Sequence, residues 1–413
     1  EDIIKVIKMK KTCNVCGKHF IKKIDLGKHP CADTFLQSQK NALTVKKYPL
    51  IVGYCSCHHL SAVYKIAAKD RYTKFDYSYT SGNSPIAINH FKNVAKKIYK
   101  KLIKKKNVNL LEIASNDGTF LKNFKNNKDI NIVGIDPSKY MCELAKKNGL
   151  KNIENSFFDE KKSFFLKKKY GTFDLIYAAN VFNHIDNPYN FLSGCKHLLK
   201  KNAIIVLEFP DLDKLLNNIC FDTIYHEHRN YYSKNSITKI LQKMNLRIIK
   251  FENLDYMSGS LRVYISNKKF DEKRLSNIKK KSLKSINIFD KKIKLIRKKL
   301  MNFINTYKKK DKVIAGFGAA TKGNTLINYC DLNYTDISFI LEKSLHKIGK
   351  FTPGSGIPIL SERKKHKLDA IIILPWNISK YLKEKILINY NVQYTSLEKI
   401  IKEIKKNDKK IKN

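Results

Sequence analysis

The stretch DTIYHEHRNYYS, residues 222–233, concentrates side chains that can move a proton. His226 and His228 flank Glu227, and Tyr225 stands just before them. An imidazole titrates near neutral pH, so a histidine can remove a proton there, and a neighbouring carboxylate can orient the ring. A phenol can donate a hydrogen bond to an oxygen on which negative charge develops. These residue types predict an acid–base site.

Two other interpretations of this stretch stay open. A zinc-binding HExxH motif holds its histidines one helical turn apart, whereas His226 and His228 are separated by a single residue. Packing alone would bury several polar groups, and each would need a hydrogen-bond partner. We favour the acid–base interpretation over packing, and packing over a metal site.

A second group of residues has the spacing of metal ligands. Cys13 and Cys16 form a CxxC pair, and Cys55 and His58 repeat that spacing in YCSCHHL. Two such pairs can surround one tetrahedral zinc ion and leave no open coordination position. The pattern predicts a structural zinc site in a small N-terminal module, with Cys57 as the alternative to His58. Four unrelated buried thiols are the alternative without a metal.

The central elements that must position such side chains alternate between apolar strands and helices. The strand NLLEIA contains Glu112, a loop with Asn116 and Gly118 follows, and a helix is expected from about Thr119. INIVGIDPS contains a second strand that ends in Asp136, and FDLIYAAN and NAIIVLEFP are two more. This alternation predicts an α/β fold with a doubly wound, mostly parallel sheet. Such sheets bind ligands at the carboxyl ends of their strands.

The composition of the first loop narrows the choice of cofactor. Asp136 could accept hydrogen bonds from ribose hydroxyls, which NAD enzymes also achieve with an acidic residue at this place. Ala114 and Asn116 stand where the GxGxxG fingerprint requires glycine, so a pyrophosphate would meet side chains. A cofactor without phosphate groups fits this loop better.

Several motifs together resemble one enzyme family. EIASNDGTFL with GIDPS is similar to the S-adenosylmethionine site of class I methyltransferases, and the whole chain resembles the sugar-nucleotide C-methyltransferases. Members of that family methylate keto-deoxysugars carried on thymidine diphosphate. They combine a zinc-binding N-terminal module with stretches like FDTIYHEHRNYYS, GSLRVY and GFGAATKGNTLINY. One position departs from the family: its last zinc ligand is usually cysteine, and the aligned residue here is His58.

The resemblance implies roles for the residues of the acid–base stretch. His228 would be the base, Glu227 would assist it or contact the sugar, and Tyr225 would polarise the keto oxygen or orient the substrate. His226 is expected to point the other way. Two further tyrosines are expected to close the same pocket, and the sequence leaves the choice between them open: Tyr77 and Tyr79.

The resemblance also implies a set of residues that hold S-adenosylmethionine. Asp136 would accept hydrogen bonds from the ribose, Asn180 would face the methionine end, and the first loop would shape the pocket. His184, in NHIDNP, is interpreted as a packing residue rather than a ligand. The full cofactor set is Glu112, Ala114, Asn116, Gly118, Asp136 and Asn180.

The C-terminal part predicts a second Rossmann-like unit. KVIAGFGAATKGNTLINY has the order strand, glycine-rich turn, helix, and lysine-rich amphipathic helices precede it. Gly316, Gly318 and Lys322 could hold a phosphate of the substrate, although glycines that serve only the tight turn are equally compatible. The expected organisation is a zinc-binding module over 1–75, a methyltransferase domain over 76–268 and a Rossmann-like domain over 269–413.

Composition bounds the partners and the compartment. The formal net charge is +46, but the lysines are spread along the chain, so we expect no nucleic-acid binding and infer that the basic surface suits a phosphorylated substrate. Nine cysteines, an odd number, argue against a disulfide framework and for a reducing cytoplasm. No signal peptide is recognised, and the longest apolar run, AIIILPW, is too short to span a bilayer. We expect a cytoplasmic monomer.

The function expected from these observations is methyl transfer from S-adenosylmethionine to a carbon of a nucleotide-linked 4-keto-deoxysugar, through a base-generated enolate. Methylation of an oxygen or nitrogen on a related sugar is the alternative within enzymes, because it would need no ketone. A basic, zinc-containing RNA-binding protein is the alternative from another class. The aromatic residues do not alternate with basic ones as an RNA-recognition surface would require.

Overall fold

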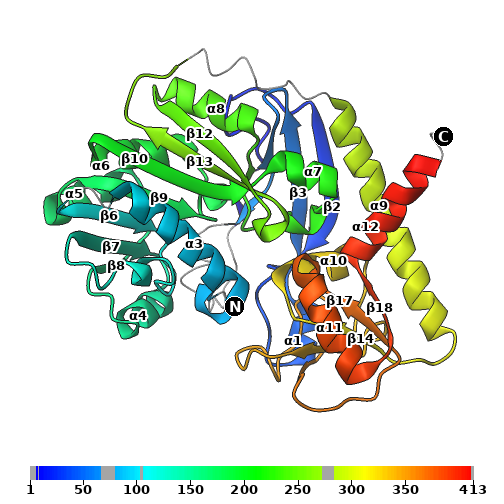
Figure 1. The fold of residues 1–413 in the computed structure, drawn as a ribbon. Helices are drawn as coiled ribbons and strands as arrows, with labels where there is room; N and C mark the ends of the chain where they lie inside the picture. The colour runs from blue at the N-terminus through cyan, green and yellow to red at the C-terminus, as the bar shows by residue number, and fades with distance from the viewer. Residues whose placement is uncertain (1–5, 8, 67–79, 103–105, 272–282, 411–413) are drawn as a thin grey trace.

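A seven-stranded sheet forms the centre of the computed structural model, which describes residues 6–7, 9–66, 80–102, 106–271 and 283–410 (Figure 1). Five neighbouring strands are parallel, and two antiparallel strands, β13 and β12, complete one edge. In spatial order the strands are β12 (Arg247–Leu254), β13 (Ser260–Ser266), β10 (Leu199–Pro210), β9 (Phe173–Ala179), β6 (Val108–Ile113), β7 (Ile130–Asp136) and β8 (Ile153–Asn155).

Helices cover both faces of this sheet, which confirms the doubly wound prediction. One apolar core packs α5 (Glu160–Tyr170), α6 (Pro188–Leu198) and α8 (Lys234–Lys243) on one face. A second core packs α3 (Pro85–Leu102) and α4 (Lys139–Lys147) on the other. Because side chains of a strand alternate between faces, a parallel strand such as β6 sends Leu111 to one core and Leu110 to the other.

The prediction of a helix from Thr119 is wrong, because only a short 3-10 turn, η2 (Leu121–Asn123), forms there. The side-chain amide of Asn123 donates to the carbonyl oxygens of Thr119 and Phe120, at 3.0 and 2.9 Å. A side chain that occupies backbone acceptors competes with the next helical hydrogen bonds. The chain therefore leaves the turn and proceeds to β7.

A four-stranded antiparallel sheet lies beside the central one and takes strands from two distant parts of the sequence. Three strands come from the N-terminal region: β2 (Lys22–His29), β3 (Tyr48–Cys55) and β4 (His59–Ala62). The fourth, β11 (Asn230–Tyr231), belongs to the DTIYHEHRNYYS stretch and pairs with β4. The division at residue 75 stays a prediction, and this strand shows that the N-terminal sheet is completed by the central region. A short pair, β1 (Val6–Ile7) and β5 (Lys65–Ile66), stands apart.

The C-terminal region forms a second parallel sheet of five strands, as a Rossmann-like unit requires. Its strands are β16 (Ile359–Ser361), β15 (Phe339–Glu342), β14 (Ile314–Phe317), β17 (Ala370–Ile373) and β18 (Gln393–Ser396). Its helices are α9 (Leu283–Lys308), α10 (Thr321–Tyr329), α11 (Ser379–Tyr390) and α12 (Leu397–Lys410).

One continuous core joins this unit to the N-terminal sheet. It combines residues of α9, α10 and α12 with residues of β2, β3 and α7 (Leu212–Asn218). Figure 1 shows α9 and α12 side by side along the edge of the molecule. Among the helices of the described ranges, none is both long and apolar enough to cross a bilayer.

Candidate active site

A cavity of about 290 Å³ opens at the carboxyl ends of β6, β7 and β9. The ends of these three strands and the loops that follow them supply most of its wall, as expected for ligand sites of doubly wound sheets. Five of the six residues predicted to hold the cofactor line it: Glu112, Ala114, Asn116, Asp136 and Asn180.

The backbone around the cavity adopts a conformation that side chains rarely tolerate. Ala114, Asn116 and Asn180 have φ angles of 59°, 50° and 53°, in the left-handed region. Non-glycine residues in that region cluster at ligand sites, where the surrounding structure holds them. Gly118 also has a positive φ, 77°, but does not line the cavity, contrary to the prediction. A Cβ atom there would lie 2.1 Å from Cδ1 of Leu150, so this glycine is needed for packing behind the loop.

Two buried carboxyl groups dominate the electrostatics of the cavity. Asp136 accepts hydrogen bonds from the backbone N–H groups of Asn116 and Ser138, both at 2.9 Å, through different oxygens. Burial raises the pKa of Asp136 to about 6, against these two hydrogen bonds. Burial, reinforced by the charges of Asp117 and Asp136, raises the pKa of Glu112 well above its ordinary value. Each Asp136 oxygen keeps a lone pair that can accept from a hydroxyl.

His228 is buried and held in one tautomer. Its Nδ1 lies 2.7 Å from the carbonyl oxygen of Thr223, and a carbonyl only accepts, so Nδ1 carries the proton. Nε2 of the neutral ring is then an acceptor, as a general base requires. Burial, together with the charges of His184 and Lys322, lowers the pKa of His228 well below its ordinary value. The ring is therefore neutral at physiological pH.

His184 connects the base to the cofactor cavity. It lines the cavity from the end of the 3-10 turn η3 (Phe182–His184), and its ring meets that of His228 edge-on, with 4.8 Å between centroids. On another side, the Tyr225 ring lies 3.9 Å from the His228 ring. The packing interpretation of His184 thus missed its position at the cavity. Its place shortly after β9, at the carboxyl edge of the sheet, was the signal that could have identified it.

The remaining residues of the acid–base prediction fall in three places. His226 packs edge-on against Tyr48 of β3, 6.1 Å between centroids, whereas His228 packs against His184 at the cavity wall. Glu227, which precedes the base in sequence, is buried. Tyr77 and Tyr79 lie outside the described residues.

The segment that carries His228 is fastened to the N-terminal sheet. The Asn230 amide accepts from Asn14 at 2.7 Å and donates to the carbonyl oxygen of Ile185 at 2.6 Å. The Ser233 hydroxyl donates to the carbonyl oxygen of His58 at 2.6 Å. Together with the pairing of β11 with β4, these bonds make the N-terminal sheet part of the support of the base.

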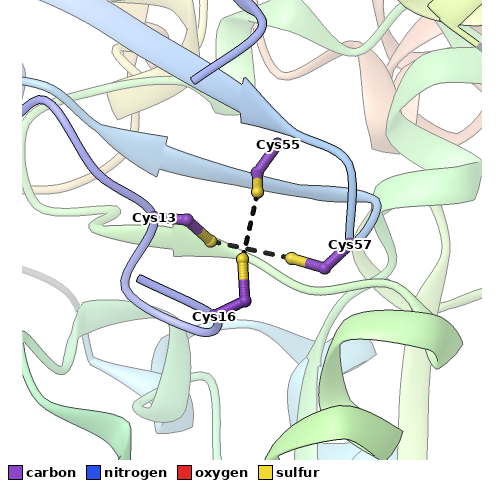
Figure 2. Close-up of side chains that lie close together, drawn as sticks. All are labelled: Cys13, Cys16, Cys55 and Cys57. Carbon is purple, nitrogen blue, oxygen red and sulfur yellow. Dashed lines mark hydrogen bonds between the residues drawn. The ribbon is translucent and has the colours of Figure 1, made fainter. Parts of the chain in front are cut away.

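Four cysteines of the N-terminal sheet bring their sulfur atoms together (Figure 2). The Sγ atoms of Cys13, Cys16, Cys55 and Cys57 all lie within 4.8 Å of one another. Figure 2 shows Cys13 and Cys16 on one turn, facing Cys55 and Cys57 at the end of β3 and the turn after it. The backbone N–H of Val15 donates to the Cys13 sulfur at 3.3 Å. This geometry brings together Cys13, Cys16 and Cys55, the three cysteines predicted as zinc ligands.

His58 is not the fourth member of the cluster, and that prediction is wrong. Its Nε2 donates to Oδ1 of Asp213 at 2.9 Å, and its Nδ1 accepts from the Tyr54 hydroxyl at 2.8 Å. Both ring nitrogens are therefore occupied, and Cys57, the alternative, takes the place. With a cysteine in the fourth position, the expected departure from the family pattern disappears.

The glycine-rich turn of the C-terminal unit does not offer the phosphate site that was predicted. The N–H of Gly318 donates to the carbonyl oxygen of Leu341 at 2.8 Å, and a Cβ atom there would lie 2.7 Å from Pro375. The next N–H, of Ala319, donates to the carboxylate of Glu342 at 2.7 Å. A backbone carbonyl and an anionic side chain of the protein thus occupy these two donors, and Gly318 serves the turn itself. Lys322 belongs to α10. Its Nζ atom is buried and lies 5.9 Å from the centre of the Trp376 ring.

Comparisons with known proteins agree with this site. Residues 88–250 match the model of a methyltransferase domain, and residues 256–389 match that of a C-methyltransferase C-terminal domain. The chain is 26% identical over 390 residues to C-methyltransferase NovU of Streptomyces niveus, covering 91% of each chain. It is 27% identical over 163 residues to the ubiquinone biosynthesis O-methyltransferase of Pelagibacter ubique, covering 37% of this chain and 66% of the relative.

Among solved structures, the plantazolicin methyltransferase BpumL in complex with S-adenosylhomocysteine is similar at 15% identity and a TM-score of 0.39, over 49% of this chain and 94% of that one. The first model covers most of the central sheet, the second covers β13 and four of the five strands of the C-terminal sheet, and the relative that spans both regions is a C-methyltransferase. The chain is therefore an S-adenosylmethionine-dependent methyltransferase, and over most of its length it is similar to a C-methyltransferase.

Proposed function

We propose that this C-methyltransferase acts on a nucleotide-linked 4-keto-deoxysugar, with thymidine diphosphate as the carrier. The observation that carries the proposal is the tautomer of His228, which leaves Nε2 as a proton acceptor beside the cofactor cavity. A ketone makes the neighbouring C–H acidic enough for an imidazole to remove its proton, whereas methylation of a hydroxyl needs no carbon acid.

In the proposed step, Nε2 of His228 takes the proton from the carbon next to the ketone, and the C–H electron pair becomes the enolate. S-adenosylmethionine, held by Asp136 and the loop of Ala114 and Asn116, would supply an electrophilic methyl group on a positively charged sulfur, and its transfer to the enolate carbon would leave the sulfur as a neutral thioether. The low pKa of His228 keeps the ring neutral and ready to accept the proton. The buried environment that lowers the pKa also makes the protonated ring short-lived.

Two neighbours of the base complete the proposed arrangement. The Tyr225 ring lies against the His228 ring, so its hydroxyl belongs to the same region and can donate to the keto oxygen as negative charge develops there. Glu227 is the carboxylate nearest in sequence to the base, and we assign to it a contact with the sugar or support of the protonated ring.

For the cofactor, Asp136 and the loop of Ala114 and Asn116 have the required chemistry. Both oxygens of Asp136 are anchored by backbone N–H groups and keep a lone pair for the two ribose hydroxyls. Asn180, whose N–H donates to the carbonyl oxygen of Glu208 at 2.7 Å, lines the cavity, and we assign its side chain to the methionine end.

We further propose that the four-cysteine cluster binds a structural zinc ion. Tetrahedral coordination with zinc–sulfur bonds of about 2.3 Å puts the sulfur atoms about 3.8 Å apart. The Sγ atoms of Cys13 and Cys57 lie 3.7 Å apart, and those of Cys16 and Cys55 3.1 Å apart, so small movements suffice. Four thiolates fill the coordination sphere, and the ion would hold the N-terminal sheet together rather than take part in the chemistry.

A panel of nucleotide sugars tests the proposed function. Incubation of the enzyme with S-adenosylmethionine and each sugar, followed by mass spectrometry, should show a gain of one methyl group only for keto-deoxysugars, and fragmentation should place it on carbon. Transfer to sugars without a ketone, or to an oxygen or nitrogen, would reject carbon-acid chemistry on this substrate.

A further inference from the structure

Two oppositely charged groups, the ammonium of Lys322 and the carboxylate of Asp222, are buried where the C-terminal unit meets the segment that carries the base. Lys322 belongs to α10, and Asp222 belongs to the 3-10 turn η4 (Phe221–Thr223). The two elements pack together through the rings of Phe221 and Tyr329, 4.9 Å apart. Asp222 is fully buried. Burial raises the pKa of its carboxyl group to about 6, and the positive charge of Lys322 acts in the opposite direction.

Both charged groups lie against the indole of Trp376, but they form no hydrogen bond with each other. Within the described ranges, neither Nζ of Lys322 nor Oδ1 of Asp222 has a hydrogen-bond partner. A buried polar atom without a partner costs on the order of 1–3 kcal/mol, and more when it is charged. Native structures therefore seldom leave two such atoms beside each other unless a ligand or an ordered water completes them.

The rest of the arrangement is rigid and has an aromatic wall. The other carboxylate oxygen of Asp222, Oδ2, accepts from Nε1 of Trp376 at 2.5 Å. That bond and the nearby backbone N–H groups of Asp222 and Thr223 orient the carboxylate, and Oδ1 itself makes no hydrogen bond. The indole also lies beside the ammonium group of Lys322, 5.9 Å from the ring centre to Nζ. An acceptor, a donor and an aromatic face thus come together, and the face can pack against C–H groups of a ligand.

The chemistry of this pair selects the group that completes it. A phosphate could accept from Lys322, but its negative charge would be buried beside Asp222, and like charges at low dielectric repel strongly. A hydroxyl group has both capacities: its oxygen accepts from the ammonium, and its hydrogen is donated to the carboxylate. A sugar hydroxyl therefore matches the two open atoms.

The position of the pair relates it to the base. Thr223, the residue after Asp222, supplies the carbonyl oxygen that fixes the His228 ring. The positive charge of Lys322 also helps to lower the pKa of His228. A hydroxyl held here would belong to the same sugar ring from which His228 removes a proton.

We propose that Lys322 and Asp222 together bind one hydroxyl group of the sugar, so that the C-terminal unit contacts the sugar ring itself rather than the phosphates of the nucleotide. This inference rests on the proposed function, because it requires a sugar substrate. It changes the group assigned to Lys322 from a phosphate to a hydroxyl.

Calorimetry with two probes tests the proposal. Wild-type enzyme, saturated with S-adenosylhomocysteine to prevent turnover, is titrated with thymidine diphosphate and with thymidine diphosphate-4-keto-6-deoxyglucose. Lys322→Met, which keeps most of the side-chain stem, should weaken binding of the sugar nucleotide at least about tenfold, as expected for loss of a charged hydrogen bond. Its affinity for thymidine diphosphate should stay unchanged. Lys343→Met removes an exposed charge from the same unit and should alter neither.

Other outcomes overturn the proposal in distinguishable ways. Equal weakening of both probes by Lys322→Met would assign Lys322 to a phosphate, and no weakening would remove it from the site. If this variant fails to fold, Asp222→Asn carries the test, because it keeps the acceptor for Trp376 and should also weaken only the sugar nucleotide. If the wild type binds neither probe, the proposed function itself fails and the hydroxyl contact with it, whereas effects confined to variants bear on the contact alone.

Discussion

At the scale of single residues, one hydrogen bond decides which atom of His228 can react. The Thr223 carbonyl fixes the proton on Nδ1, and burial keeps the ring uncharged, so Nε2 is available without a preceding proton loss. His226, two positions earlier, is equally buried but packs on Tyr48. Two histidines of the same motif thus have different chemistry because their neighbours differ.

Asp136 provides a prediction at this scale, because its protonation competes with cofactor binding. With the pKa raised to about 6, the carboxylate is ionised above that pH and accepts from the ribose hydroxyls. Below pH 6 it takes up a proton, so the dissociation constant for S-adenosylmethionine should rise by up to about tenfold per pH unit. Calorimetry between pH 5 and 8 measures this.

Asp136→Asn is the matched control for the pH experiment. It should bind the cofactor about ten- to hundredfold more weakly at pH 8, as loss of charge-assisted hydrogen bonds implies. Its remaining pH dependence reports Glu112, the other buried carboxyl group of the cavity. A wild-type affinity that stays constant from pH 8 to 5 would contradict the role assigned to Asp136.

At the scale of elements, the N-terminal sheet has a function beyond its own stability. Strand β11 follows the base directly in sequence and is the edge strand of the sheet that carries the cysteine cluster. Asn230 of this strand bonds to Asn14, which lies between Cys13 and Cys16. A metal ion that orders the cysteines would therefore also order the backbone after His228.

The choice between Cys57 and His58 gives a prediction for this sheet. Cys57→Ala should lose most of the bound zinc, because three remaining thiolates leave a position open. His58→Ala should keep about one zinc per chain, since its ring bonds to Tyr54 and Asp213 instead. It should still unfold at a lower temperature, because buried hydrogen bonds are lost. Metal analysis by mass spectrometry after purification without chelators decides between the two residues.

A His58→Ala protein without zinc, together with a Cys57→Ala protein that retains it, would contradict the assignment made from the geometry. Wild-type protein without any metal would reject the zinc proposal as a whole, and the four thiols would then be buried side chains only.

At the scale of the whole molecule, the sequence predicts those features of the fold that follow from the local order of apolar and polar residues. The end of an apolar strand placed Asp136 and Asn180 at the carboxyl edge of the sheet, and the two Rossmann-like units follow from the alternation of strands and helices. Within YCSCHHL, the side chain that faces the cluster depends on the turn at His58, whose φ is 55°. That backbone angle cannot be predicted from the alternation of residue types.

Contacts between distant segments were also beyond local pattern. Asp222 and Lys322 meet because α10 packs on η4, and Glu342 reaches the glycine-rich turn because β15 lies next to β14. Both contacts require the packing of whole elements. The phosphate prediction failed for this reason, since the glycines were visible in the sequence and the carboxylate that occupies the turn was not.

The central claim is that His228 removes a proton from carbon, and deuterium exchange tests it most directly. With S-adenosylhomocysteine bound, wild-type enzyme in deuterated water should exchange the proton next to the ketone of the nucleotide sugar. His228→Ala should lose exchange and methyl transfer by about 10²–10⁴-fold, with cofactor affinity nearly unchanged. His226→Ala, the matched histidine variant, should keep both activities within about tenfold of wild type. If His228→Ala retained exchange and transfer, the base would lie elsewhere and this account of the site would be wrong.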